Sequence, residues 1–221
     1  MAEAAAQPPA LTRQEEEAAF MHEAALNSAW AGARLALGGL TFVFGAFVFA
    51  FFYLRSLNSH GMWYPASFHP PQLWSGTLIM AFVVSSAVVQ SIALQGLKAG
   101  HKAPWMAGAL LALALGLAAV GVQLWQLTNE PFFPGSSGFA SVFTGGTPVL
   151  AVIVFCAMVW LEILIVSAGK IPQISFVEQP PTYTGAFEVQ RFQARLSGFT
   201  VVWNYLAAVA IIFWVLFYLV H

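Results

Sequence analysis

Glu162 is the one acidic residue that lies well inside a long apolar segment of the chain. It stands near the end of the run SGFASVFTGGTPVLAVIVFCAMVWLEILIVSAGK, which extends from Ser137 to Lys170. Burying a charge in a membrane is costly, so an acid in such a segment is first considered functional or paired. Because Glu162 lies about two turns before Lys170, a structural hydrogen bond or ion pair is favoured, with proton or ion handling as the alternative.

Histidines are the other residues in this chain that could hold a metal or a haem. All of them fall in tails or loops between apolar segments, whereas a haem or copper centre within a membrane takes histidines from helices. We therefore expect no catalytic, cofactor-binding or metal-binding residue in this chain. His60 and His69 share an outer loop with Met62, so an external copper site is an alternative there. Their spacing matches no strong metal motif, and ordinary exposed histidines are favoured. The histidines are His22, His60, His69, His101 and His221.

The composition excludes a soluble globular domain. The chain is 59% hydrophobic and 8% charged, contains no aspartate, and has a mean hydropathy of +0.75. A soluble protein needs far more polar residues than this to cover its surface. The single cysteine, Cys156, lies within an apolar run and excludes a disulfide framework or a cysteine metal cluster. Basic patches typical of nucleic-acid binding are absent from the sequence.

Five apolar segments reach the length of about 20 residues that a helix needs to cross a bilayer. The sequence therefore predicts an all-α membrane protein, a five-transmembrane-helix bundle formed by residues 29–221. Residues 1–28 are expected to form a polar tail and an amphipathic surface helix, with Thr12 and Glu15 as a capping box; a disordered tail is the alternative. The expected spans are residues 29–55, 72–97, 103–127, 147–168 and 196–220.

The distribution of basic residues predicts the orientation of the bundle. Lysine and arginine accumulate on the cytoplasmic side of membrane proteins. Seven of the eight lie on the side that holds the N-terminus, and only Arg55 lies on the other. We expect a cytoplasmic N-terminus and an external C-terminus at His221. Tryptophans near the span ends fit membrane interfaces: Trp30, Trp63, Trp74, Trp105 and Trp125.

Small residues recur every four positions in the third span, at Gly108, Ala112 and Gly116. Such a stripe lets neighbouring helices approach closely, so we expect it to form a helix–helix contact. The first span carries a phenylalanine-rich face over residues 42–52, which we expect to meet a partner subunit or lipid.

Four segments carry a resemblance to a known family. They are FVFGAFVFAFFYLRS (42–56), SSAVVQSIALQGLKAG (85–100), GFASVF (138–143) and the terminal VVWNYLAAVAIIFWVLFYLVH (201–221). Their order, together with a Trp/Pro outer loop and five spans, resembles subunit III of haem–copper oxidases in its five-helix bacterial form, over residues 34–221. The resemblance implies a non-catalytic, stabilising subunit of a respiratory terminal oxidase in the bacterial plasma (inner) membrane. Its partners would be oxidase subunit I, which reduces dioxygen, the other subunits and membrane lipids; haem and copper would belong to the partners, and phospholipid would lie between the helices.

The chain departs from that family at its polar membrane positions. A membrane glutamate of the family corresponds to Leu40, two histidines of the fourth span to Leu150 and Ile153, and a histidine and an aspartate of the last span to Ser197 and Thr200. Roles of those residues in proton supply are therefore not carried over. Two alternatives stay open: an accessory subunit of a nitric oxide reductase, and a small transporter or channel with its site at Glu162.

Overall fold

The computed structural model describes residues 13–57, 61, 63–65, 69–172 and 186–220, and the elements within them are helices. Five segments are long and apolar enough to cross a membrane, which confirms the predicted all-α, five-span architecture. The predicted cap at Thr12, His60 and the terminal His221 lie outside the described residues. The elements are α1 (Arg13–Ser56), α2 (Leu73–Lys98), α3 (Lys102–Asn129), α4 (Gly138–Gly169), α6 (Ala186–Trp214) and the π-helical turn η1 (Val215–Leu219).

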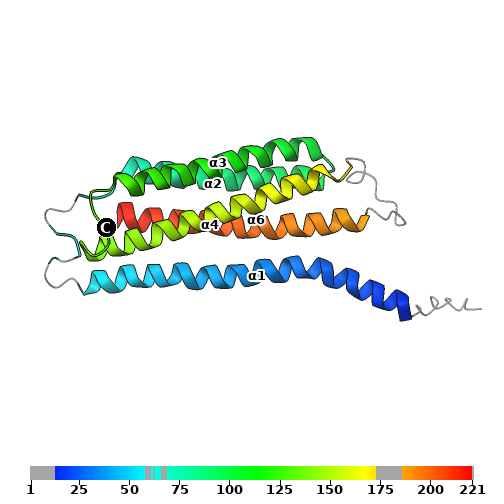
Figure 1. Cartoon of the computed structure of the whole chain (residues 1–221), viewed down its shortest axis with the longest axis horizontal. Coiled ribbons are helices and arrows are strands. Elements are labelled where there is room, and N and C mark those ends of the chain that lie inside the picture. The colour runs from blue at the N-terminus through cyan, green and yellow to red at the C-terminus, as the bar shows by residue number, and fades with distance from the viewer. Residues whose placement is uncertain (1–12, 58–60, 62, 66–68, 173–185, 221) are drawn as a thin grey trace, which may run out of the picture.

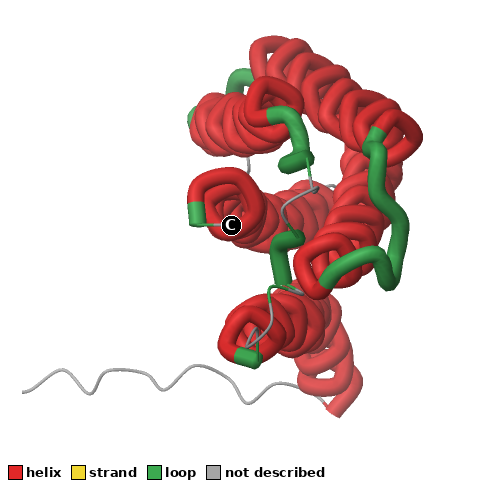
Figure 2. The backbone as a smooth tube through the Cα atoms, turned by 90° about the vertical axis from the view of Figure 1, so that its left-hand side faces the viewer, coloured by secondary structure: helices red, strands yellow, loops and turns green. Residues whose placement is uncertain are grey.

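The helices run alongside one another, and α6 occupies the middle of the bundle (Figures 1 and 2). It packs against α1, α2 and α4, while α2 and α3 form the most closely packed pair. Helix α1 lies at the side of the bundle against α6 and α4, and its N-terminal part extends beyond the other helices (Figure 1). Residues 13–28 are the first turns of α1, which continues without a break into the first span.

Helices α2 and α3 begin and end within two residues of the predicted spans, but α4 and α6 begin earlier than predicted. Helix α4 starts at Gly138 rather than at residue 147, because the Ser137 hydroxyl accepts a hydrogen bond from the Ala140 amide and caps the helix. A segment rich in Gly and Ser is typical of a loop, which is why the predicted span began only at residue 147. Backbone polar groups near a membrane must be paired, and the helix pairs them.

Helix α6 starts at Ala186 rather than at residue 196, and its first turns are amphipathic. Val189, Phe192 and Leu196 are buried at helical spacing. The charged residues that favoured a loop in the sequence, Glu188 and Arg191 among them, are exposed on the opposite side of the same turns.

The turn between α2 and α3 needs only three residues. Gly100 adopts a φ of +87°, which is open to glycine at little cost. The amides of Gly100 and His101 donate to the carbonyls of Leu97 and Gly96, at 2.9 and 3.0 Å. These bonds pair the last carbonyls of α2 and reverse the chain directly into α3.

Aromatic side chains fill the bundle at the end where η1 lies. Phe217 makes edge contacts with Phe51, Phe139 and Phe143, with ring centroids 5.3 to 6.0 Å apart. Trp63 packs on Phe51 in the same cluster and is 4% exposed. Trp105 at the other end is also buried. Trp63 and Trp105 therefore face the interior of the bundle, whereas the sequence had predicted that they lie at a membrane interface.

Candidate functional site

Glu162 is exposed on the outward side of α4, away from the core. Its neighbours Leu161 and Leu164 are buried, whereas Val159, Ile163 and Val166 share its exposed side. Within the described part of the chain, no ion pair joins Glu162 to Lys170 or to another basic residue. The carboxylate therefore stands on an apolar outer face of the bundle.

The small residues of α3 lie in contacts with two different helices. A methyl group on Gly108 would come 2.7 Å from the Cβ of Ala93 in α2, and one on Gly116 would come 2.1 Å from the sulfur of Met158 in α4. Ala112 between them has no exposed surface.

The backbone of Ala112 also belongs to a buried polar network. Its carbonyl accepts a hydrogen bond from the Ser86 hydroxyl at 2.7 Å, and that hydroxyl accepts one from the Trp203 indole N–H at 3.2 Å. This network joins α2, α3 and α6 in the apolar interior.

A second polar network lies at the end of the bundle that holds η1, and it centres on Gln126 of α3. The Gln126 amide donates to the Ser75 hydroxyl of α2 at 2.9 Å and to the Tyr218 hydroxyl of η1 at 2.7 Å. Gln123, one turn earlier, donates to the Gln126 side-chain oxygen at 3.4 Å. π-Helical turns are rare and occur often at functional sites; this one places Tyr218 in the network.

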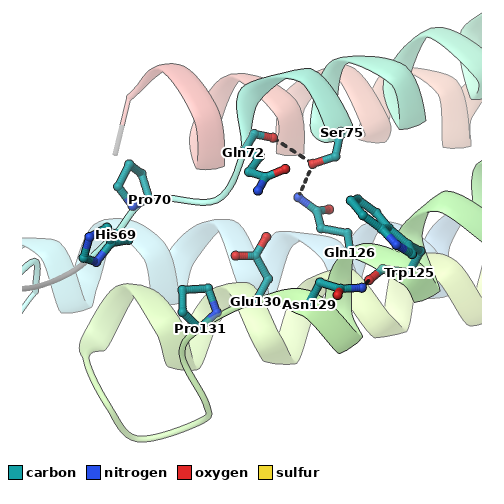
Figure 3. A pocket seen from close by; sticks show the side chains of 9 residues that line it. All are labelled: His69, Pro70, Gln72, Ser75, Trp125, Gln126, Asn129, Glu130 and Pro131. Atoms are coloured by element: carbon teal, nitrogen blue, oxygen red, sulfur yellow. Dashed lines mark hydrogen bonds between the residues drawn. The ribbon is translucent and has the colours of Figure 1, made fainter.

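Next to this network, a pocket of about 520 Å³ opens between the start of α2 and the end of α3 (Figure 3). Its carboxylate is Glu130, which directly follows α3. Amide and hydroxyl side chains surround this acid, and Figure 3 shows the Glu130 carboxylate directed towards the side of the pocket where Gln72 and Gln126 lie. The lining residues are His69, Pro70, Gln72, Ser75, Trp125, Gln126, Asn129, Glu130 and Pro131.

The environment of Glu130 changes its acidity. Burial raises the pKa of the Glu130 carboxyl to about 7, and a hydrogen bond from the Gln126 side chain partly opposes that increase. Near neutral pH the group is therefore divided between a neutral acid that donates a hydrogen bond and a carboxylate that attracts a cation. This pocket is the candidate functional site.

Sequence reasoning missed this site because Glu130 falls just outside the predicted third span. A signal was present, since Gln123, Gln126 and Glu130 are spaced at three and four residues and lie on one side of a helix. The sequence does not show that Ser75 and Tyr218 meet this side.

The described histidines lie apart from one another. His69 is exposed at the pocket rim, and His101 is exposed at the turn between α2 and α3. His22 of α1 lies 3.5 Å from the Gln190 side-chain oxygen and packs on Phe187, both at the start of α6. No group of three or more His, Cys, Asp or Glu residues that could hold a metal ion occurs among the described residues.

The chain matches no protein-family model, and a search of curated proteins finds no match to it.

Proposed function

We propose that this chain is a non-catalytic, subunit III-like component of a respiratory haem–copper terminal oxidase in the bacterial inner membrane. In this role it packs beside subunit I, which carries the haem and copper and reduces dioxygen. The outward position of Glu162 is the observation that supports an assembly component most directly.

The free-energy cost of an unpaired charge in a membrane is the reason that the position of Glu162 supports an assembly component. If α4 is centred in the bilayer, Glu162 lies roughly 13 Å from the midplane at 1.5 Å per residue, just inside a hydrocarbon half-thickness of roughly 15 Å. A charge at the centre costs about 3 kcal/mol on insertion scales, and less near the edge. A hydrogen-bond donor or cation on a neighbouring subunit would remove most of that cost, so the exposed face of α4 suits a protein partner better than lipid alone.

The first helix offers a second surface of the same kind. Leu35 and Phe42 of α1 are 78% and 81% exposed, and Phe49, which lies two helical turns after Phe42, is exposed as well. A methyl group on Gly38 or Gly45 would meet nothing within 4 Å. Small and large residues thus alternate on a face that a partner helix or lipid would cover.

The identity of the complex rests on the order of the four motifs. Residues 42–56 belong to α1, residues 85–100 to the end of α2 and the turn after it, residues 138–143 to the start of α4, and the described part of 201–221 to α6 and η1. The order of these segments and the number of spans support a subunit III-like chain.

The transporter alternative receives less support from the geometry. A pathway within the bundle would need Glu162 to face the interior, where Leu161, Met158 and Phe199 are almost fully buried. An accessory subunit of a nitric oxide reductase would share the same architecture. Identification of the partner subunit is therefore needed to distinguish an oxidase subunit from a nitric oxide reductase subunit.

Gentle purification of the full chain with an N-terminal tag, from its native membrane, tests the proposal. We expect co-purification of haem proteins, a haem spectrum, and dioxygen-reducing activity, with oxidase subunit I identified by mass spectrometry. Co-purified nitric oxide reductase subunits would assign the chain to that complex instead. A haem-free homo-oligomer would refute the assembly role and favour transport.

The variant Glu162→Gln tests whether the acid is structural. Glutamine keeps the shape and the hydrogen bonding but removes the charge, so we expect less of this subunit in the purified complex and unchanged turnover for each assembled complex. Glu23→Gln, on the exposed N-terminal part of α1, is the matched control. Normal subunit content with lost proton pumping or activity would mean that Glu162 handles protons.

A further inference from the structure

We propose that the pocket beside Glu130 binds the ammonium group of a zwitterionic aminophospholipid headgroup. The pocket combines one carboxylate, an aromatic ring and several amide oxygens, which is the chemistry that recognises an organic cation.

The carboxylate supplies the charge. Within the described residues, no lysine or arginine forms an ion pair with Glu130. The side chains around it are neutral amides and hydroxyls, and the titratable groups that face it are His69 across the pocket and Tyr218 behind Gln126. A primary ammonium group would give Glu130 a charge-assisted hydrogen bond, which is about twice as strong as a neutral one.

Trp125 supplies the aromatic surface. Its ring lies 5.3 Å from that of Trp74 at a tilt of 46°, and both side chains are about half exposed beside the pocket. Tryptophan is enriched at the level of lipid headgroups, and its ring face attracts ammonium groups. This pair therefore favours a lipid headgroup over a soluble amine as the source of the cation.

The size and surroundings of the pocket fit a headgroup. A volume of about 520 Å³ lies within the usual range for ligand pockets. Leu73 and Leu124, next to Trp74 and Trp125 in the sequence, are more than half exposed and offer apolar surface for acyl chains. His69 and the amide group of Gln72 provide hydrogen-bond donors for the phosphate.

This inference requires that the chain lies in a membrane but does not depend on the identity of its complex. The lipid inference can be tested on the full chain alone, so its failure would not refute the proposed function. Failure of the proposed function would likewise not refute the lipid inference.

The full chain in dodecyl maltoside is mixed with equal amounts of dioleoyl phosphatidylethanolamine and dioleoyl phosphatidylglycerol, and retained lipid is counted by native mass spectrometry. We expect retention of the ethanolamine lipid over the glycerol lipid. Glu130→Gln should weaken that retention by roughly tenfold or more, and Glu23→Gln, the same substitution at an exposed position outside the pocket, should not change it. Equal retention of the two lipids, or an unchanged Glu130→Gln variant, would overturn the proposal.

Two further measurements guard against a misfolded variant and a wrong ligand source. Retention by the unmodified chain should increase from pH 5.5 to pH 8.5, because Glu130 loses its proton with a pKa of about 7; a flat profile would count against the carboxylate. Free ethanolamine at millimolar concentration should leave the lipid bound. Full displacement by ethanolamine would overturn the lipid headgroup as the source of the amine.

Discussion

Alanine substitutions of three glycines in α3 test how closely this helix packs. Gly116 faces Met158 of α4, Gly108 faces Ala93 of α2, and a methyl group on Gly121 would meet nothing within 4 Å. All three residues lie within the same helix, so the substitution adds the same group to the same secondary structure. Differences between the variants therefore report the neighbouring helices.

The expected magnitudes follow from two opposing effects. Replacing glycine by alanine within a helix stabilises it by about 0.8–1 kcal/mol, so Gly121→Ala should be neutral or stabilising. At Gly116 the new methyl would lie 2.1 Å from the Met158 sulfur, far inside a normal contact of about 3.5–4.0 Å. Overpacking of this kind costs about 1–3 kcal/mol, which leaves a net loss of up to about 2 kcal/mol.

Gly108 should be less tolerant than its longer contact distance suggests. The opposing atom is the Cβ of Ala93, 2.7 Å away, which is fixed to the backbone of α2. Met158 can change its rotamer, whereas Ala93 moves only if the two helices separate. Separation would weaken many dispersion contacts along the α2–α3 interface at once.

Thermal unfolding of the purified chain in detergent, followed by tryptophan fluorescence, measures these effects. A loss of 1 kcal/mol corresponds to a shift of about 2–4 °C for a domain of this size. We expect Gly121→Ala to melt at or above the unmodified chain, and Gly108→Ala and Gly116→Ala to melt several degrees below Gly121→Ala. Met158→Ala should remove the penalty at Gly116 in a double-mutant cycle. Melting of all three glycine variants at the same temperature would refute this account of the packing.

Three further outcomes are expected. Ala112→Leu should lower subunit content and melting temperature, because Ala112 is fully buried. Ala114→Leu, on the exposed side of α3, should change neither quantity appreciably. Equal effects of the two substitutions would mean that the small residues Gly108, Ala112 and Gly116 face lipid. The melting temperature of the unmodified chain should fall as pH rises from about 4.5 to 7, because the folded state holds the Glu130 proton to a higher pH than the unfolded chain. The melting temperature of Glu130→Gln should not fall over this range, and parallel profiles of the two proteins would contradict the raised pKa. Reporter fusions after His221 should behave as exported and those after Lys102 as cytoplasmic, and the reverse result would invert the bundle.

The sequence alone determined the number of spans and most of their ends. Apolar runs of membrane length are visible without a structure, since the bilayer requires them and water excludes them. It also indicated that Gly108 and Gly116 leave room for a neighbour. The early starts of α4 and α6 escaped prediction, because Gly, Ser and charged residues suggested loops where a serine cap and an amphipathic face form helix.

Only the tertiary structure decided which side of each helix faces inward. Core and lipid are both apolar, so hydropathy along a membrane helix does not distinguish them. Glu162 was predicted to be a structural group with a hydrogen bond or ion pair, and only the structure shows that it lies on the outward side of α4. The polar network beside the Glu130 pocket depends on Ser75 and Tyr218, which lie 51 and 92 residues from Gln126 in the chain. Hydrogen bonds between separate helices need a fixed rotation of each helix, and packing of all five sets that rotation.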